Sequence, residues 1–419
     1  MKKVSGITSL FLFLAVSLTL LYACSSTSNG DDPVRPAATY SVTVSPVNAS
    51  GEEAVTPSVS NAEAGTTVTL TAALTTGRRV ALSAAGVTIT PSAISENGGA
   101  ASFSMPGADV TVLAEFDDIP IAGAIEAHTA NAASFNMRYV PAGGTFLMGE
   151  LVDDDPVTVT LTNDFLMGET EVTQLLWESV WGATWPGSVP SSSDGLGDNH
   201  PAYYVNWYDA AAFCNLLTEA DGDISTDEKV YYSNAALTIA YTKADAADKS
   251  AVYADWNKKG FRLPTEAEWE YSARYIDGTT WNHGNHVSGD TEYACLAMAG
   301  CSHALSSNER ISDYAWWSGN NGSYGNPTYG CKAVGQKNAN ALGLRDMGGN
   351  LYEWCYDWKG DYYGGSATNP KGPPNGFYRV YRGGGWGYSA MYLRCAARDG
   401  YTPVSRYSYI GFRLCRSAD

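Results

Sequence analysis

The chain has 419 residues and a formal net charge of −18, with 44 acidic and 26 basic residues. A chain of this length exceeds what one hydrophobic core usually organises, so we expect two domains. Because binding to phosphate groups requires clustered Lys and Arg, the acidic balance argues against a nucleic-acid partner and against adsorption to anionic lipid headgroups. The 27 Tyr and 12 Trp residues suit either a large core or an adhesive surface.

The N-terminus has the pattern of an export signal. Two lysines precede an apolar run, Ile7 to Leu21, that is too short to span a membrane comfortably. Leu21 to Cys24 then resemble a bacterial lipobox, in which the chain is cut before Cys24 and that cysteine is lipidated. A plain secretory signal with an incidental cysteine is the alternative. Residues 1–24 are therefore predicted to be a lipoprotein signal peptide, and the protein is expected at the bacterial outer membrane or cell surface, held to the membrane by this lipid anchor only.

A stalk and a small all-β module are predicted next. Residues 25–38 are small, polar and acidic, as a flexible tether requires. Residues 39–117 are predicted to form the module, because Val and Thr alternate there with a period of two between Gly and Pro residues. Residues 100–116 resemble the small β-repeat modules of bacterial surface proteins. We expect the module to act as a spacer; a second binding module is the alternative.

A linker and a larger domain follow the module. Residues 118–133 are interpreted as the linker by composition, and residues 134–419 as the main domain. Within it, residues 135–149 have the pattern of two strands meeting at a Gly-Gly turn. Beyond Tyr275 the residue types Gly, Asn, Trp and Tyr dominate, which predicts a loop-rich structure organised around a few strands.

Three helices are predicted in the first half of the main domain. Apolar residues recur at helical spacing after Thr173 and again after Asp209. A third helix should begin at Thr265, because Thr265 and Glu268 form a capping box in which each side chain satisfies a backbone N–H at the helix start. The polar, Asp-rich stretch 220–258 is interpreted as an insertion.

The last part of the chain alternates between two kinds of position. A sparse set of residues has the composition of a backbone frame, and its arginines can make forked hydrogen bonds that hold loops in place. The frame consists of Arg382, Gly383, Gly384, Arg394, Ala396, Arg398, Pro403, Arg406 and Ile410 to Arg413.

Between the frame positions the residues are mainly Tyr, Ser, Gly, Thr, Asp and Val, without a hydrophobic period. Tyr supplies a large rigid contact area, and Ser and Gly supply local fit, so this composition is typical of an adaptable contact surface. An ordinary Tyr-rich segment of a β-rich domain is the alternative. The candidate ligand-binding residues are Trp386, Gly387, Tyr388, Ser389, Met391, Tyr392, Leu393, Ala397, Asp399, Tyr401, Thr402, Tyr407 and Tyr409.

Several ordered blocks of the main domain resemble a known family. The blocks are Glu169 to Thr173, His200 to Trp207, Gly260 to Arg274, Asn340 to Trp354, Arg382 to Gly384 and Ile410 to Arg413. They resemble the formylglycine-generating enzyme, or sulfatase-modifying factor, domain over about residues 134 to 417. The resemblance implies an α+β, C-type-lectin-like fold with little regular secondary structure.

The chemistry of that family is not expected to transfer. Its enzymes oxidise a substrate cysteine with two copper-binding cysteines shortly after the Arg-Gly-Gly turn, but Gly385 to Leu393 contain no Cys here. A related iron-dependent branch uses a His cluster, and the five histidines here lack its H-x-x-x-H-x-E spacing. We therefore expect neither copper nor iron, and no enzyme activity. An oxidoreductase or maturation enzyme of the family with atypical chemistry is the alternative. The five histidines are His128, His200, His283, His286 and His303. His283 and His286 are interpreted as loop residues and not as metal ligands.

Two structural features of the family enter as implications of the resemblance. The first is a disulfide between Cys214 and Cys395, which would brace the site in an exported protein. The second is a structural calcium site, in which carboxylates and backbone carbonyls supply oxygen ligands; the alternative is that the carboxylates only cap loops. The implied calcium ligands are Asp346, Gly349, Leu351 and Glu353.

The C-terminal segment also resembles the retroelement-diversified members of this fold, such as the Treponema variable protein. In those proteins, adenines of a template repeat are randomised, so scattered positions vary inside a fixed frame that ends at Ile-Gly-Phe-Arg. Most candidate residues here are reachable from Asn codons by changing adenines, although Met391 is not. The resemblance implies a non-catalytic binder of a protein or glycan on another cell or host surface. A structural adhesin or envelope protein is a further alternative.

Overall fold

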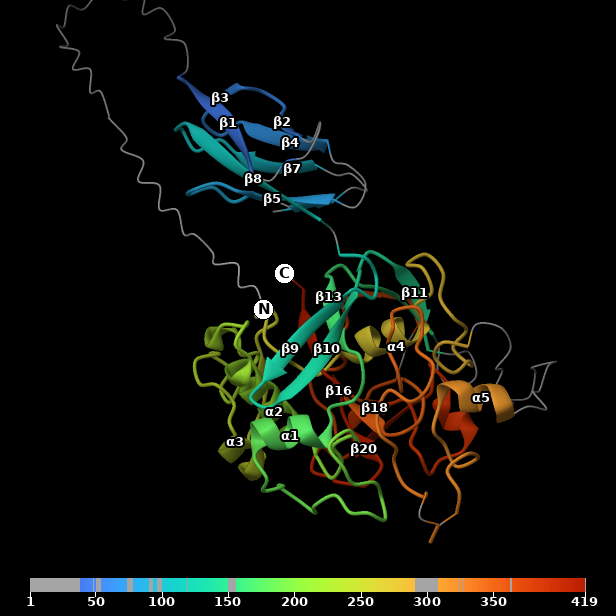
Figure 1. Cartoon of the computed structure of the whole chain (residues 1–419). Coiled ribbons are helices and arrows are strands. Elements are labelled where there is room, and N and C mark those ends of the chain that lie inside the picture. Colours follow the sequence, from blue (N-terminus) through green and yellow to red (C-terminus); the bar gives the residue numbers. More distant parts are fainter. Residues whose placement is uncertain are drawn as a thin grey trace, which may run out of the picture. The chain divides into compact units, whose positions relative to one another are not determined.

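The computed structural model describes residues 38–418 apart from residues 48, 50–53, 74–77, 90–92, 96–99, 119, 150–155, 291–307, 324, 327 and 362–363. The predicted signal peptide, Cys24 and nearly all of the predicted stalk lie outside these residues. Within the described part, no helix is long and apolar enough to cross a membrane. The chain divides after Asp118 into two compact units. Figure 1 colours the chain by sequence, so the two units can be told apart by colour.

The first unit is all-β, as the alternating pattern predicted. Two sheets, with strand orders β3-β1-β8-β5-β6 and β2-β4-β7, enclose one apolar core that includes the fully buried Val68 and Val112. In β4, for example, the alternation buries Val68 and Leu70 and leaves Thr67 and Thr71 exposed. The strands are β1 (Thr39–Val47), β2 (Ala54–Pro57), β3 (Asn61–Glu63), β4 (Thr67–Ala73), β5 (Arg78–Ser83), β6 (Ala93–Ser95), β7 (Ala100–Ser104) and β8 (Val110–Asp118).

The second unit begins earlier than the sequence predicted. Strand β9 (Ile125–Ala130) pairs antiparallel with β10 (Ala133–Val140), in a sheet of order β21-β13-β10-β9 with β13 (Phe165–Gly168) and β21 (Cys415–Ser417). The prediction of a linker over residues 118–133 is therefore wrong for β9. The physical reason is that this polar edge strand is held by backbone pairing rather than by an apolar run.

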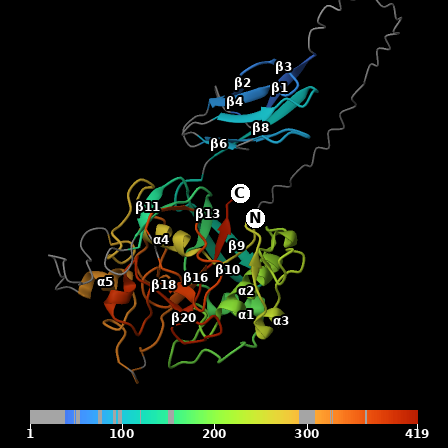
Figure 2. The same cartoon turned by 180° about the vertical axis from the view of Figure 1, so that it is seen from behind.

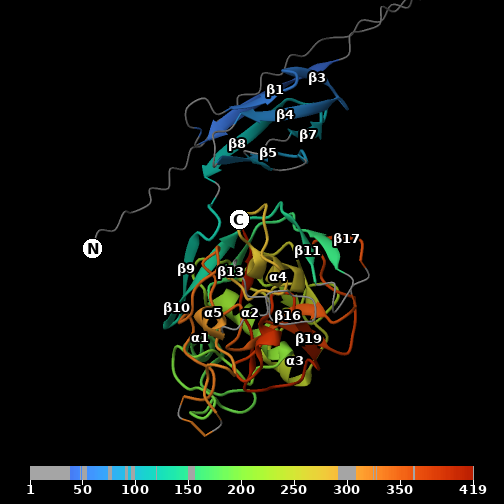
Figure 3. The ribbon, with the colours of Figure 1, turned by 90° about the vertical axis from the view of Figure 1, so that its right-hand side faces the viewer.

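Two strands lie where a Gly-Gly hairpin was predicted, but they do not pair with each other. Strand β10 pairs with β9 and β13, whereas β11 (Thr145–Met148) joins a separate sheet with β12 (Val157–Thr160) and β17 (Ser366–Thr368). Figure 3 shows β11 and β17 together at one side of this unit. The Gly-Gly stretch is thus a loop that connects strands of two different sheets.

The three predicted helices are present. Helix α1 (Gln174–Trp181) begins after its N-cap Thr173, and α4 (Glu266–Arg274) begins after Thr265 with the predicted capping box. Helix α2 (Trp207–Ala220) starts earlier than predicted, because Asn206 is its N-cap and Asp209 is the partner three residues into its capping box. Figure 2 shows α1 and α2 beside each other.

The predicted insertion and the loop-rich half also contain short elements. Residues 220–258 hold a two-stranded ladder and the short helix α3, and a further helix, α5, was not predicted because its sequence has no apolar period. These elements are η1 (Thr226–Glu228), β14 (Tyr231–Tyr232), α3 (Lys243–Asp248), β15 (Tyr253–Ala254) and α5 (Asn308–Tyr314).

A four-stranded sheet of order β19-β18-β16-β20 carries the C-terminal segment. Strand β18 (Arg379–Arg382) pairs antiparallel with both β16 (Tyr352–Trp358) and β19 (Arg398–Tyr401), while β20 (Ile410–Gly411) runs parallel to β16. Helix α4 packs against β16 and β18 (Figure 1). Between β18 and β19 lies a short 3-10 turn, η2 (Ala390–Leu393). The sheet therefore holds both ends of each loop that the candidate site uses.

Candidate functional site

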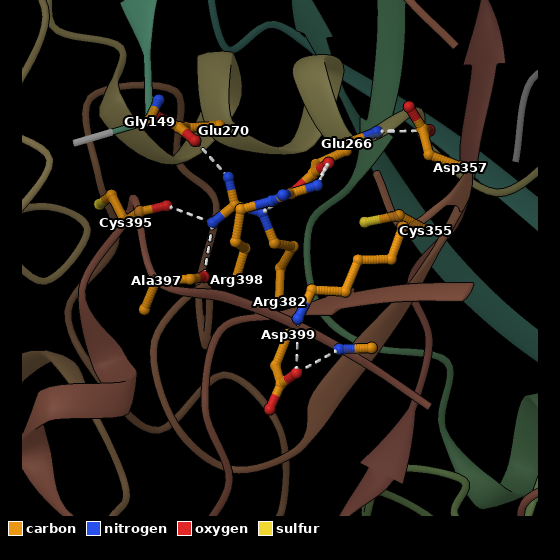
Figure 4. Close-up of polar contacts among 12 residues, drawn as sticks. Gly149, Glu266, Glu270, Cys355, Asp357, Arg382, Cys395, Ala397, Arg398 and Asp399 are labelled. Carbon is orange, nitrogen blue, oxygen red and sulfur yellow. Dashed lines mark hydrogen bonds and ion pairs between the residues drawn. The ribbon is translucent and has the colours of Figure 1, made fainter. Parts of the chain in front are cut away.

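The centre of the frame is Arg382, whose side chain is fully buried. Its Nη1 donates to the backbone carbonyls of Cys395 (2.8 Å) and Ala397 (2.6 Å). The same guanidinium pairs with two carboxylates of α4, Glu266 at 3.1 Å from Nε and Glu270 (Figure 4). One side chain thus fastens the end of β18, the start of β19 and a core helix to one another.

Two further arginines of the segment make forked pairs with carboxylates far away in sequence. Arg398 binds both oxygens of Glu266, at 2.7 and 2.8 Å, and Arg406 binds both oxygens of Asp209, at 2.8 and 3.0 Å. Both carboxylates are buried in first turns of core helices, where negative charge is favourable. Each of these ion pairs therefore ties the C-terminal segment to a rigid helix.

The remaining two frame arginines follow the same rule. Arg394 donates to the backbone of Met391 (2.8 Å) and to the side chain of Asn285 (3.0 Å). Arg413 binds both oxygens of Glu353, at 2.7 and 2.6 Å. We call Arg382, Arg394, Arg398, Arg406 and Arg413 the arginine frame. Every member pairs with a side chain outside the C-terminal segment.

The Arg-Gly-Gly turn depends on its second glycine. Gly384 has φ +78°, a left-handed conformation that favours glycine. A Cβ there would lie 2.8 Å from the backbone oxygen of Tyr392 and 2.8 Å from the side chain of Leu393. The turn therefore brings η2 directly against β18, which fixes where the residues between them are presented.

Five tyrosines of the segment form a continuous array. Adjacent ring centroids lie 5.6 Å apart for Tyr392 and Tyr388, 5.1 Å for Tyr388 and Tyr409, and 5.0 Å for Tyr409 and Tyr407. Tyr407 and Tyr401 follow at 5.0 Å, with their hydroxyl oxygens 3.1 Å apart. We call these five residues the tyrosine surface. Such edge-to-face and stacked contacts let aromatic rings order one another while remaining partly exposed.

Two tyrosines outside the segment support this surface from beneath. The ring centroid of Tyr352 on β16 lies 4.5 Å from that of Tyr381 on β18 and 5.0 Å from that of Tyr388. The Tyr381 hydroxyl donates to Asp399 (3.3 Å), and Lys359 pairs with the same carboxylate (2.9 Å). Sequence reasoning missed Tyr352 and Tyr381 as supports. Their alternation along paired strands is the pattern that could have indicated them.

The hydroxyl groups of Tyr388, Tyr401 and Tyr409 remain protonated at neutral pH. Burial raises the pKa of Tyr388 and of Tyr409, and the hydrogen bond with Tyr407 raises the pKa of Tyr401. A neutral phenol both donates and accepts a hydrogen bond. The surface therefore offers apolar ring area and uncharged polar groups together.

The structure places most of the other predicted contact residues around the tyrosines. Met391 and Tyr392 are 44% and 39% exposed, Gly387, Ser389 and Asp399 are also exposed, and Ala397 and Thr402 are half-buried. The exposed rim thus combines small, polar and apolar groups. It is contiguous in the chain with η2 and β19.

Two predicted contact residues are corrected to core positions. Trp386 is buried, packs in a cluster with Tyr203 and Leu351, and donates through its Nε1 to the backbone of Ser408 (3.0 Å). Leu393 is 1% exposed and packs in a different apolar cluster. Both side chains face inward, so they support the loops and do not form the surface. The segment's lack of a hydrophobic period hid this.

The implied disulfide between Cys214 and Cys395 is wrong in this structure, where both thiols are free and buried. Cys214 packs in the core around Trp177, whereas Cys395 belongs to a second core around Trp269. The Cys395 thiol donates to the backbone oxygen of Ala273 at 3.6 Å. The two cysteines lie in different cores, so no bond joins them. Cys295 and Cys301 lie outside the described residues.

Two of the implied calcium ligands, Glu353 and Asp346, lie near Arg413, whereas Leu351 packs in an apolar cluster with Tyr203 and Gly349 pairs with the backbone of Trp316. Glu353 gives both carboxylate oxygens to Arg413 and accepts a further bond from Trp269 (2.6 Å). Asp346 accepts from the Gly335 backbone (2.6 Å) through one oxygen, while its other oxygen is buried without a partner. Burial raises the pKa of Asp346 to about 6. Among the described residues, no group of three or more His, Cys, Asp or Glu is placed to hold a metal.

One carboxylate near this site was not predicted. Glu171 is buried, and one of its oxygens has no hydrogen-bond partner. Burial raises its pKa, and the nearby charge of Asp346 raises it further. The unpartnered oxygens of Asp346 and Glu171 suit a cation or a retained proton, whereas Glu353 is committed to Arg413. Calcium remains a proposal that fits Asp346 better than Glu353.

Comparisons with known proteins agree with this geometry. A model of the sulfatase-modifying factor enzyme 1-like domain matches residues 125–418. The chaperone protein LppX of Paenibacillus barcinonensis is 32% identical over 249 residues, which cover 58% of this chain and 76% of that protein. The formylglycine-generating enzyme of Streptomyces coelicolor is 30% identical over 251 residues, or 58% of this chain and 61% of the enzyme.

A solved structure extends the likeness to three dimensions. Treponema denticola variable protein 1 is 32% identical and superposes with a TM-score of 0.54, covering 70% of this chain and 99% of its own. The fold of the second unit is therefore the C-type-lectin-like one that the sequence blocks predicted, sheet-rich with few helices. The matched range also includes β9, in agreement with the corrected domain start.

Proposed function

The chain belongs to the sulfatase-modifying factor enzyme 1-like domain family, and from that premise we propose that it is a non-catalytic binding protein. The binding site is the tyrosine surface, and its ligand is a protein or glycan on another cell or host surface. The protein is held at the bacterial outer membrane or cell surface through the lipid on Cys24. The rim residues that adenine changes can reach, including Ser389 and Asp399, vary between copies of the gene.

One observation carries this proposal: the frame arginines and the tyrosines contact different groups. The frame arginines pair with core side chains such as Glu266, Asp209 and Glu353. The tyrosines contact one another and the two tyrosines beneath them, and four of the five also pack against the apolar core. Because the loops are held by the frame, the side chains between frame positions can change without unfolding the domain. The likeness to a protein named a variable protein supports the same reading.

The available thiols argue against the chemistry of the enzymes in this family. The stretch after the Arg-Gly-Gly turn has no cysteine, and Tyr388 and Leu393 lie there instead. Burial raises the pKa of all five thiols in the described residues, at Cys214, Cys331, Cys355, Cys395 and Cys415. A thiolate is the reactive and copper-binding form, so these cysteines are poor candidates for catalysis.

Ligand binding is tested by a matched pair of tyrosine variants. Tyr392 on the tyrosine surface and Tyr253 on β15 are both 39% exposed, so Tyr392→Ser and Tyr253→Ser remove similar area at two places. The labelled mature chain is applied to a printed array of glycans and to intact animal cells. We expect Tyr392→Ser to weaken the binding at least tenfold and Tyr253→Ser to leave it unchanged.

Two results would overturn the proposal. The first is equal binding by both variants, which would place the contact elsewhere. The second is stoichiometric copper or iron in the purified chain together with oxidation of a cysteine-containing peptide, which would make it an enzyme. Diversification is tested separately, by sequencing the gene from many clonal lines and searching the neighbouring DNA for a near-copy of the codons for residues 387–409. Identical clones without such a template would remove that part of the proposal.

A further inference from the structure

A pocket of about 470 Å³ lies in the second unit, apart from the tyrosine surface. The first turn of α4, the end of β16 and the sheet of β11, β12 and β17 enclose it. None of the five tyrosines of the surface lines it. Its size falls within the range of sites for small molecules. The proposed function gives no role to this pocket.

The walls of the pocket are mainly apolar. Met148 and Val157 come from β11 and β12, Trp358 and Ala367 from β16 and β17, and Pro373 from the loop between β17 and β18. The ring of Trp358 is held in place by Arg379, whose guanidinium carbon lies 3.7 Å from the ring centroid. Gly360 and Gly364 also line the pocket, and because they have no side chain the backbone can lie close to the cavity.

The polar groups around the first turn of α4 are paired with one another. Asp357 is 3% exposed and accepts a bond from the Glu266 backbone N–H at the start of α4 (2.8 Å). The Glu266 side chain is bound by Arg398 through both oxygens and by Arg382 (Figure 4). The arginine that lines the pocket is thus neutralised by its carboxylate partner. Lys371, whose ammonium lies 4.2 Å from the centroid of the Trp256 ring, and Asp361 also line the pocket and carry one charge of each sign, so the charged groups of the lining balance.

The carboxyl of Asp357 is also neutral at physiological pH. Burial raises its pKa to about 8, and the neighbouring charge of Glu266 adds to this effect. A protonated carboxyl donates one hydrogen bond and accepts others. It therefore offers little attraction to a cation, and a purely apolar ligand would leave its polar atoms without partners.

We propose that this pocket binds one neutral sugar unit of a glycan. A pyranose ring has an apolar C–H face, which suits Trp358 and Pro373, and an edge of hydroxyl groups, which suits Asp357 and the glycine backbone. The paired charges in the pocket disfavour acidic and basic sugars. Arg398 of the arginine frame lines the site and none of the proposed variable residues does, so it is a fixed subsite whose specificity does not change when the tyrosine surface varies.

The test uses the full mature chain and a set of methyl glycosides. Neutral probes are the methyl glycosides of glucose, galactose, mannose and N-acetylglucosamine; glucosamine and sialic acid serve as the cationic and anionic probes. Saturation-transfer NMR and calorimetry measure binding. Ala367→Phe fills the pocket from a half-buried wall position. We expect saturable binding of at least one neutral glycoside, weakened at least tenfold in Ala367→Phe and unchanged in Tyr392→Ser.

Each other outcome counts against the proposal. If no neutral glycoside binds, or if binding survives in a folded Ala367→Phe variant, the pocket is not a sugar site. If a charged probe binds more tightly than every neutral one, the ligand class is wrong. Should Ala367→Phe fail to fold, Ser366→Trp obstructs the same pocket from an exposed position on β17 and gives the same decision. Loss of binding in Tyr392→Ser would assign the sugar to the tyrosine surface instead, so the two proposals fail separately.

Discussion

The arginine frame and the tyrosine surface occupy the same stretch of chain but differ in where their contacts go. Arg382, Arg398 and Arg406 reach out of the segment to carboxylates on α4 and α2. Tyr388, Tyr392 and their neighbours contact side chains of the same segment and the tyrosines beneath. The difference shows that residues that form a surface and residues that hold the loops in place can be interleaved within a single segment.

The arginine frame and the tyrosine surface should also differ in how much each contributes to stability. Removing one partner of a buried ion pair destabilises a protein by about 3–5 kcal/mol, because a charge is left uncompensated. An aromatic pair contributes about 0.5–1.5 kcal/mol beyond the area that it buries. A domain with a typical net stability of about 5–15 kcal/mol tolerates several losses of the second kind but few of the first. The frame should therefore be intolerant of change, and the surface permissive.

The largest effect is expected at the centre of the frame. Arg382→Met keeps an unbranched side chain but leaves Glu266 and Glu270 with less compensating charge, and it frees the carbonyls of Cys395 and Ala397. We expect a loss of about 3–5 kcal/mol in the free energy of unfolding, measured by urea denaturation. A loss below about 1 kcal/mol would show that the frame does not hold the loops, and the comparison would break.

A smaller effect is expected at the edge of the frame. The Arg406 side chain is 24% exposed, so solvent screens part of its pairing with Asp209, whose side chain is only 1% exposed. Arg406→Ala should lower the free energy of unfolding by about 1–2 kcal/mol. Hydrogen exchange should speed up around Thr402 to Tyr409, while β16 stays protected. Uniform acceleration across the domain would argue that Arg406 supports the whole core and not this loop.

Local rules predicted the parts of the fold that depend on neighbouring residues. The capping box of Thr265 and Glu268 and the alternating strands of the first unit are short-range patterns, and the structure confirms both. The edge strand β9 was missed because its stability comes from pairing with β10, not from its own composition. Helix α2 was placed late because Asn206 and Asp209 are both good capping residues, and only geometry shows which is the cap.

The candidate site was predicted in outline but not in depth. The frame was recognisable because Arg and Gly have special roles, and the structure shows the contacts of each frame arginine. The inward orientation of Trp386 and Leu393 could not be read from a segment without a hydrophobic period. Pairing of Cys214 with Cys395 rested on resemblance alone, and the separation of the two cores overturned it. Which residues meet across the sheet requires three-dimensional contacts.

The pH dependence of stability should follow carboxyls near the frame, not the tyrosine surface. Asp357 has a folded pKa of about 8 against an ordinary value of 3.8, so between these values the folded state binds the extra proton. Its contribution to stability is therefore greatest at low pH and is lost as the pH rises towards 8. Asp357→Asn keeps an acceptor for the Glu266 N–H. We expect this variant to flatten the fall in the free energy of unfolding between pH 5 and pH 8, measured by urea denaturation at each pH.

Asp346 provides the comparison for that experiment. Burial raises the pKa of Asp346 to about 6, so this carboxyl also lowers the free energy of unfolding as the pH rises, but over a lower pH range. In Asp357→Asn, the free energy of unfolding should therefore still fall between pH 4 and pH 6. The double variant with Asp346→Asn should reduce this remaining fall, and Glu171, whose pKa burial also raises, accounts for a further part of it. An unchanged slope in both variants would mean that neither carboxyl retains its proton in the folded state.

The smallest effect on stability is expected on the tyrosine surface itself. Tyr392 is 39% exposed and touches the rest of the domain mainly through Tyr388, so Tyr392→Ser should change the free energy of unfolding by about 0.5 kcal/mol or less. The same variant should weaken ligand binding at least tenfold, because an exposed aromatic ring contributes its area only when a partner covers it. Binding and stability are thus expected to respond in opposite order to Tyr392→Ser and Arg406→Ala. A loss of about 2 kcal/mol or more is typical of a buried group. If Tyr392→Ser destabilised the domain by that much, the tyrosines would be part of the structure that holds the loops in place. The separation between frame and surface would then be lost at the position where it should be clearest.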